Sequence, residues 1–194
     1  MLGPDDSLPF RPRRVLVAGL SGAGKSTLAD RIADTAALPR TELDALYHGP
    51  GWVPRESFED EVESFTARAR WVTEWQYRAV RTLLAQRAEL LVWLDLPFLP
   101  VVLPRLVRRT VRRRRRKEVL WNGNVEPPLW SIVRDREHVV RWTVATRGKY
   151  RELVPRLARE RPGLTIVRLR SSAEVEAWLA GPLRTAVIGP SEDA

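Results

Sequence analysis

The sequence predicts an α/β fold in which a parallel sheet lies between two layers of helices. Two observations lead to this prediction. Short apolar runs alternate with helical patterns along the chain, and a glycine-rich turn joins the first run to a helix. At 194 residues and 44% hydrophobic content, the chain is long enough to bury the core of one domain. We expect this domain over residues 13–182, between a flexible leader (1–12) and a C-terminal tail (183–194).

Five short segments are candidate strands. They are VLVAG (15–19), RTELD (40–44), WVTEW (71–75), LLVWLDL (90–96) and TIVRLR (165–170). Helical patterns separate or follow them, at residues 26–38, 56–70, 78–87, 101–117, 129–145, 147–160 and 173–180. Strands that alternate with helices in this way favour a parallel sheet with helices on both faces.

Composition excludes several classes of protein. The chain has no cysteine, and its two histidines, His48 and His138, lie far apart, so we expect no zinc site. The longest apolar stretch is interrupted by Asp95 and three prolines and cannot cross a bilayer as a helix. The N-terminus carries acids where a signal peptide carries bases. We therefore expect a cytoplasmic protein without a membrane segment.

The sequence GLSGAGKS, Gly19 to Ser26, matches the P-loop pattern G-x-x-x-x-G-K-[ST] between an apolar strand and a helix. Glycines let the backbone wrap around phosphate oxygens, and the helix N-terminus offers N–H donors to them. Lys25 supplies a charge to the β- and γ-phosphates, and Ser26 supplies a hydroxyl to Mg²⁺. The predicted ATP-binding residues are Gly19, Ser21, Gly22, Ala23, Gly24, Lys25, Ser26 and Thr27. The cofactors expected are ATP and Mg²⁺.

Phosphoryl transfer also requires an acid near the metal ion and cations around the moving phosphate. Glu74 and Asp95 each end an apolar strand, and either could hold Mg²⁺ or its waters. Between Arg105 and Lys117, nine of thirteen residues are basic. The whole chain has 33 Lys+Arg against 24 Asp+Glu, so this segment contains the entire charge excess of +9. A phosphate group or a nucleic acid is the expected counterpart of such a run.

Several motifs occur in an order that resembles adenylate kinase-like P-loop proteins. After the P-loop they are ELDALYHGPGW (42–52), WVTEWQY (71–77), LVWLDLP (91–97), RLVRRTVRRR (105–114) and LWNGN (120–124). Within that family the chain most resembles the bacterial group labelled DNA topology modulation proteins, over about residues 13–180. The resemblance implies a five-stranded sheet of order 2-3-1-4-5. This order puts Glu74 beside the P-loop strand, which makes it the better candidate for the metal-side acid.

The resemblance also implies roles for individual residues. Asp44 would touch the acceptor hydroxyl, although a helix N-cap or loop acid is the alternative interpretation. Trp52 would stack on the acceptor, with core packing as its alternative. The helix after the fourth strand would lead into a short Arg-rich lid, about residues 108–127, that closes over the site. Its catalytic and substrate-binding arginines would be Arg105, Arg108 and Arg109, and further phosphate contacts would come from among Arg134, Arg141 and Arg147.

Two functions follow from these observations. The first is a P-loop kinase that moves the γ-phosphate of ATP to a small acceptor, with Lys25, Glu74, Arg105 and Arg109 in catalysis. The acceptor stays open among nucleotides, sugars and hydroxy acids. The second is a nucleic-acid-associated ATPase that binds DNA or RNA through Arg112–Lys117. The completeness of the nucleotide-binding motif favours the kinase.

Overall fold

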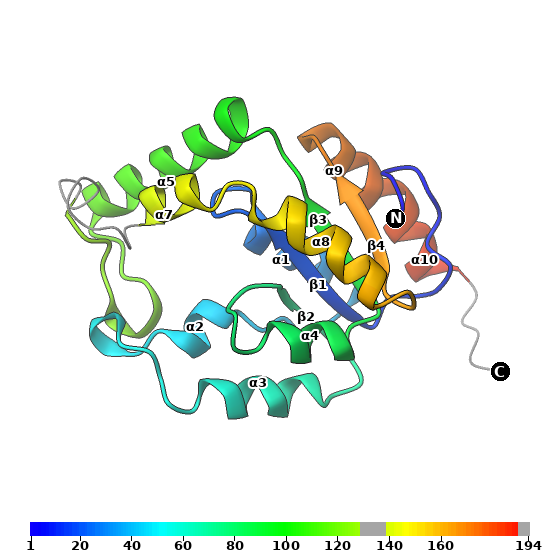
Figure 1. The fold of residues 1–194 in the computed structure, drawn as a ribbon, viewed down its shortest axis with the longest axis horizontal. Coiled ribbons are helices and arrows are strands. Elements are labelled where there is room, and N and C mark those ends of the chain that lie inside the picture. Colours follow the sequence, from blue (N-terminus) through cyan, green and yellow to red (C-terminus); the bar gives the residue numbers. More distant parts are fainter. Residues whose placement is uncertain (129–138, 190–194) are drawn as a thin grey trace.

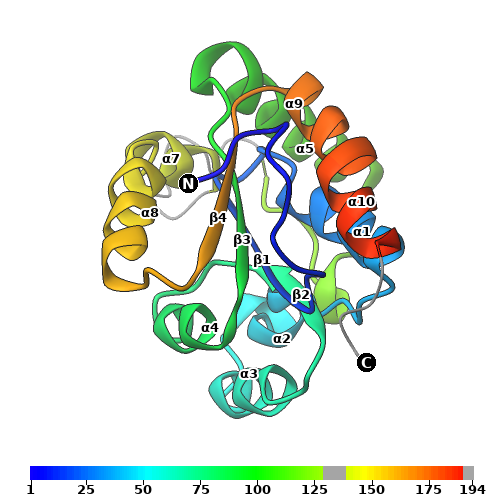
Figure 2. The same cartoon turned by 90° about the vertical axis from the view of Figure 1, so that its right-hand side faces the viewer.

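A four-stranded parallel sheet with helices on both faces forms the protein (Figures 1 and 2). It is described from a computed structural model, over residues 1–128 and 139–189. The strands are β1 (Arg14–Gly19), β2 (Trp71–Glu74), β3 (Leu90–Leu94) and β4 (Thr165–Leu169). The larger helices are α1 (Lys25–Ala36), α3 (Phe58–Thr66), α4 (Arg81–Arg87), α5 (Leu103–Arg116), α7 (Val139–Ala145), α8 (Lys149–Glu160) and α9 (Ser172–Trp178). Shorter ones are α2 (Leu43–Tyr47), η1 (Pro50–Trp52), η2 (Phe98–Val102), η3 (Trp121–Gly123), η4 (Leu179–Leu183) and α10 (Arg184–Ile188).

The sheet order is β2-β1-β3-β4, so the prediction of five strands is wrong. The segment expected as the second strand, residues 40–44, contributes only an isolated parallel bridge between Arg40 and Val72. It cannot extend further because Pro39 precedes the bridge and helix α2 begins at Leu43. The remaining four strands keep the relative order that the resemblance implies.

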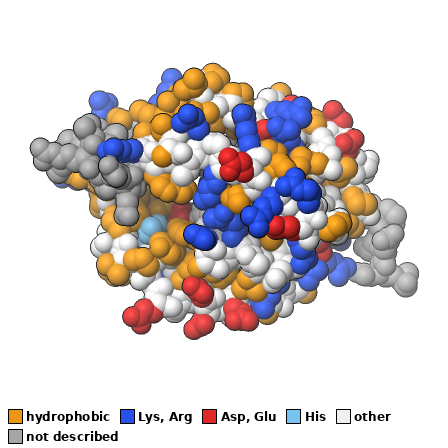
Figure 3. All heavy atoms as spheres, in the orientation of Figure 1, with side chains coloured by type: hydrophobic (Ala, Val, Ile, Leu, Met, Phe, Trp, Pro, Cys, Tyr) orange, Lys and Arg blue, Asp and Glu red, His pale blue; other side chains and the backbone are white. Residues whose placement is uncertain are grey.

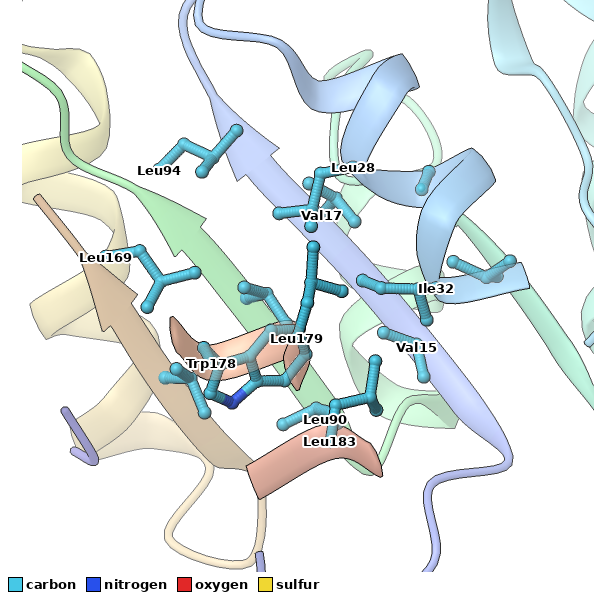
Figure 4. Packing of buried hydrophobic residues seen from close by; sticks show 14 of the residues in the cluster. Val15, Val17, Leu28, Ile32, Leu90, Leu94, Leu169, Trp178, Leu179 and Leu183 are labelled. Carbon is cyan, nitrogen blue, oxygen red and sulfur yellow. The ribbon is translucent and has the colours of Figure 1, made fainter. Parts of the chain in front are cut away.

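The core lies on both faces of the sheet. Toward α1 and α9, the strand residues Val17 and Leu90 pack in one cluster with Leu28, Ile32 and Trp178 (Figure 4). A second cluster on the opposite face lies under α3, α4 and α8. Strand β1 is apolar from Val15 to Gly19 because this part is buried on both faces, as expected for a central parallel strand.

Both ends of the described chain contact this domain. Leu2, in the segment expected as a flexible leader, forms a parallel bridge with Val167 of β4, and Leu8 is buried in the first cluster. Helix α10 falls in the predicted tail and packs against α1. Of the helix predicted over residues 129–145, the part described is α7. Among the described residues, every helix is too short or too polar to span a bilayer.

Candidate functional site

The P-loop connects β1 to α1 at the carboxyl edge of the sheet. Gly22 and Gly24 have φ angles of 85° and 96°, in the left-handed region that favours glycine. Helix α1 then begins at Lys25, and Ser26 and Thr27 lie exposed in its first turn. The loop therefore presents the start of a twelve-residue helix to any phosphate at this edge.

Gly22 also fixes the approach of the helix that leads to the predicted lid. A Cβ atom at Gly22 would lie 2.8 Å from Leu106 Cβ and 2.9 Å from the Val102 carbonyl oxygen, whereas one at Gly24 would meet nothing within 4 Å. The start of α5 thus packs directly on the P-loop backbone.

This contact predicts unequal costs for two alanine substitutions. Gly24→Ala adds only the strain of a left-handed alanine, about 1 kcal/mol. Gly22→Ala adds overpacking against α5, and we expect it to lower the free energy of unfolding by about 1–3 kcal/mol more. Urea denaturation without nucleotide measures both values. Equal losses would mean that α5 does not press on the loop.

Lys25 lies at the centre of a cluster of charges. Its ammonium group donates a hydrogen bond to the Leu20 carbonyl oxygen at 3.3 Å. Burial lowers the pKa of Lys25, Asp44 and Glu74 oppose that effect, and Arg109 adds to it. The structure therefore brings Asp44, Glu74 and one predicted lid arginine, Arg109, into electrostatic range of Lys25.

Glu74 is a buried acid with one oxygen in use. It lies at the end of β2, opposite Val17 of β1, and its side chain is 2% exposed. Oε1 accepts a hydrogen bond from Arg40 at 2.8 Å, while Oε2 is buried without a hydrogen-bond partner. Arg40 also bonds Asp30 at 2.5 Å, and the sequence carries no signal for either contact.

Asp95, the other candidate for the metal-side acid, has both oxygens in use. Arg151 Nε donates to Oδ1 at 3.0 Å and Arg168 Nε donates to Oδ2 at 3.0 Å. These two ion pairs hold the Asp95 carboxylate in place. Glu74 is accordingly the acid with a free oxygen for a further ligand.

The residues at this edge suit magnesium. Mg²⁺ in phosphate sites keeps several waters and takes only one or two protein oxygens beside the phosphates. The exposed Ser26 hydroxyl and the unpartnered Glu74 Oε2 are donors of this kind. Within the described ranges no three His, Cys, Asp or Glu side chains gather into a metal cage.

Asp44 lies in the first turn of α2, among aromatic residues. The N-cap of this helix is Glu42, so Asp44 is not the cap that the alternative interpretation required. Gln76 Nε2 and the Tyr77 hydroxyl both donate to Asp44 Oδ1, at 2.7 and 2.6 Å. Tyr77 stacks on Tyr47 with ring centroids 4.1 Å apart.

The turn LWNGN, residues 120–124 and called here the lid turn, docks onto the segment between α2 and η1 (Figure 1). Asn122 Nδ2 donates to the His48 carbonyl oxygen at 2.5 Å, and Asn124 Nδ2 donates to that of Gly49 at 2.9 Å. Trp52 donates its backbone N–H to Asn124 Oδ1 at 3.0 Å and its indole N–H to Val125 O at 3.3 Å. Trp52, predicted to stack on the acceptor, thus contributes to lid docking.

The predicted lid arginines separate into two groups. Arg109 is half-buried, and this burial lowers its pKa, as does Arg113, while Glu126 and Asp44 raise it. Arg105 points elsewhere and donates to Ser172 Oγ at 2.9 Å at the start of α9. Arg108 is exposed on α5, in a shallow cleft of about 430 Å³ on the outer face of the helix.

The inner part of the basic run is engaged within the lid. Arg113 lies 3.6 Å from Glu118 and 3.7 Å from Glu126, and its guanidinium carbon is 5.6 Å from the centroid of the Trp121 ring. Arg114 donates to the Glu126 carbonyl oxygen at 3.1 Å. Among the residues described, these two arginines therefore stabilise the lid through contacts within it.

The sequence analysis did not single out Lys149 and Arg81, two cations of which Lys149 lies in electrostatic range of Lys25. The Lys149 ammonium lies 5.0 Å from the Trp142 ring centroid, and Arg81 lies over Trp75 at 5.6 Å. Burial lowers the pKa of Lys149 to about 8, and the neighbouring charges of Arg81 and Lys25 contribute. Lys149 is one of three lysines in an arginine-rich chain, and this rarity was the available signal.

Basic side chains gather over the middle of one face, where α8 lies, and acidic ones along the edge formed by α3 (Figure 3). Of the arginines expected as further phosphate contacts, Arg147 is exposed and lies beside a cavity of about 680 Å³ that also borders Leu20. None of Asp44, Glu74 and Arg109 lines that cavity. Arg141 is exposed on α7, and Arg134 lies outside the described residues.

Comparison with known proteins supports the fold. No family model and no curated protein matches the chain. A gluconokinase from Sinorhizobium meliloti has a similar structure, with a TM-score of 0.52 and 22% identity over 91% of this chain and 95% of that one. A sugar kinase from Janibacter is 19% identical over 91% and 90% of the two chains (TM-score 0.43). A shikimate kinase from Acinetobacter baumannii is 16% identical over 91% and 89% (TM-score 0.43).

The gluconokinase similarity extends over nearly the whole of both chains. At such low identity it establishes the architecture alone. The specific resemblance to DNA topology modulation proteins stays a prediction. The chain has the fold of P-loop small-molecule kinases.

Proposed function

We propose that this protein is a kinase that transfers the γ-phosphate of ATP to a hydroxyl group of a small acidic acceptor. The observation that carries the proposal is the electrostatic cluster of Lys25, Asp44, Glu74 and Arg109 beside a complete P-loop. A structural ion pair needs two groups, whereas this cluster combines the cations and acids that phosphoryl transfer requires.

Each residue has a role in this mechanism. The P-loop amides and Lys25 hold the β- and γ-phosphates, and Asp44 accepts the proton of the acceptor hydroxyl. The acceptor oxygen forms a bond to the γ-phosphorus as the bond to the ADP oxygen breaks. Arg109 stabilises the charge that spreads over the transferred group. Ser26 and Glu74 would hold Mg²⁺, whose charge would neutralise the β- and γ-oxygens.

The acceptor class follows from the cations near Lys25. Lys149 and Arg81 have no acidic counterpart in the described contacts, and both lie over aromatic rings instead of carboxylates. Partly buried cations of this kind favour an anionic ligand, because a charge removed from water needs a partner. A carboxylate or phosphate on the acceptor would supply it.

A matched pair of acceptors tests this proposal. We expect labelled ATP to phosphorylate a sugar acid or hydroxy acid much faster than the corresponding neutral sugar or alcohol. Lys149→Ala should raise the KM of the acidic acceptor about tenfold or more, since a hydrogen bond to a charged group contributes about 1.5–3 kcal/mol. The KM for ATP should stay the same. Because only protonated Lys149 attracts an anion, the acceptor KM of the wild type should rise above about pH 8.

Lys117→Ala is the matched control, because it removes an equal charge from an exposed position. A larger effect of Lys149→Ala on ATP than on the acceptor would assign this cation to the nucleotide instead. If no acceptor is phosphorylated and only nucleic acid stimulates ATP hydrolysis, the kinase proposal fails.

The nucleic-acid function keeps one supporting observation, the cationic cleft on the outer face of α5. Its basic residues are Arg108, Arg112, Arg115 and Arg116. Four phosphate contacts with duplex DNA would give a log–log salt slope of about −3.6. Binding that is weak and nearly independent of salt would remove this alternative.

A further inference from the structure

The Asp44 carboxylate is held by one oxygen only. Both of its donors, Gln76 Nε2 and the Tyr77 hydroxyl, bond Oδ1. Oδ2 takes part in none of the hydrogen bonds of the described residues. Two donors on one oxygen fix the rotation of the carboxylate and leave the other oxygen directed away from them.

The hydrogen bonds that link His48, Tyr77 and Asp44 fit a single arrangement of protons. A carboxylate cannot donate, so the Tyr77 hydroxyl donates to Asp44 and must accept any second bond. His48 Nε2 lies 3.2 Å from the same hydroxyl, so that nitrogen carries the proton and donates it. Nδ1 of His48 is buried without a partner, as an unprotonated nitrogen can be. The direction of donation therefore runs from His48 through Tyr77 to Asp44.

The other side of His48 belongs to the lid turn. Asn122 donates to the His48 carbonyl oxygen, and the Trp121 ring lies nearly parallel to the imidazole, at 26° with centroids 6.0 Å apart. Trp52, which donates its backbone N–H to Asn124 of the lid turn, packs edge-to-face against the imidazole with ring centroids 4.9 Å apart. Undocking the lid turn would remove the groups that enclose His48 on this side.

Tyr77 is held in an unfavourable backbone conformation. Its φ of 55° lies in the left-handed region, which costs a bulky residue free energy unless its surroundings enforce it. The stack on Tyr47 and the two hydrogen bonds of the hydroxyl supply that constraint. The position of the Tyr77 hydroxyl thus depends on contacts that reach as far as the lid.

We propose that His48 and Tyr77 are positioning residues that couple lid docking to the orientation of Asp44. With the lid turn docked, His48 is fixed, Tyr77 is fixed by His48, and Asp44 keeps Oδ2 free for the acceptor hydroxyl. With the lid turn undocked, His48 loses the contacts that hold it, Tyr77 is no longer fixed by His48, and Asp44 can rotate. This proposal rests on the proposed function only where Asp44 is the proton acceptor; the coupling itself concerns the protein alone.

The coupling is measurable without any activity. The chain has two histidines, so its imidazole NMR spectrum contains two titrating signals, and His138→Gln assigns them. Burial lowers the pKa of His48, and Asp44 opposes that effect. Asn122→Gly removes the lid bond and suits the φ of 53° at that position. We expect it to raise the pKa of His48 toward its ordinary value of 6.5.

Enzyme activity then tests the second link, from Tyr77 to Asp44. Tyr77→Phe keeps the ring and removes the hydroxyl, so the Asp44 carboxylate loses one of the two donors that fix its rotation. We expect kcat to fall about tenfold, while the KM values for ATP and for the acceptor stay the same. The other charged groups near Asp44, which stay in place, are Lys25, Glu42, Glu74 and Arg109.

Tyr47→Phe is the control, because it alters the same stack but its hydroxyl makes no hydrogen bond with the described residues. It should leave kcat and both KM values unchanged. A fall in kcat that Tyr47→Phe shares, or that comes with higher KM values, would assign Tyr77 a purely structural role and overturn the proposal, as would an unchanged kcat. An unchanged His48 titration in Asn122→Gly would overturn the link to the lid, whether or not an acceptor has been identified.

Discussion

Replacing Lys25 by alanine is expected to lower kcat/KM for ATP on the order of 10³-fold. The ammonium group lies at the start of α1, where the phosphates would bind, and burial strengthens its interaction with them. Its loss also leaves the buried Glu74 and the nearby Asp44 with less positive charge to balance them. ATP titration followed by tryptophan fluorescence measures the binding part, and steady-state turnover measures the rest.

Lys117→Ala again provides the control of equal charge, at the exposed C-terminal end of α5. We expect its ATP affinity to equal that of the wild type. If Lys25→Ala bound ATP as tightly as the wild type, the glycine-rich turn would be a structural feature and the proposed function would fail.

Arg109→Ala is expected to lower kcat on the order of 10²-fold while ATP affinity changes little. Arg109 is the predicted lid arginine that lies in electrostatic range of Lys25 and Asp44, as an arginine acting on a transferred phosphate must be. A group that acts mainly in the transition state changes kcat more than ground-state binding. Rapid-quench measurement of phosphate transfer, together with the ATP dissociation constant, separates the two effects.

Arg115→Ala is the matched substitution on the same helix, because Arg115 is exposed and belongs to the outer cleft of α5. It should leave kcat unchanged. Equal losses of kcat in the two variants would mean that α5 acts through its total charge, which would remove the specific role of Arg109.

Local patterns predicted most of the framework. Strands β1 and β3 are short apolar runs bounded by turn residues, and the P-loop motif fixes the strand and helix around it. Glu74 and Asp95 were both candidates because each ends an apolar strand, and only the family resemblance placed Glu74 beside β1, where the structure has it. The edge segment at 40–44 was predicted wrongly, since pairing at a sheet edge depends on a neighbour and on where the next helix begins.

Contacts between distant residues could not be predicted in the same way. Arg105 and Arg109 are one helical turn apart and looked equivalent, yet one bonds Ser172 and the other lies near Asp44. The asparagines of LWNGN were recognised as a motif, but their bonds to residues 45–49 span more than seventy positions. Lys149 falls in a helix that is otherwise unremarkable in sequence, and only the fold brings it near Lys25.

The docked lid turn has a kinetic consequence. Five hydrogen bonds of Trp52, Asn122 and Asn124 join the lid turn and Val125 to residues 45–52. An entrance that is mostly shut admits a molecule only during its brief open periods, and the apparent affinity falls in proportion to the open fraction. At high ligand concentration the observed association rate then levels off at the opening rate. Release of the product requires the same hydrogen bonds to break, so we expect the rate of lid opening to limit turnover.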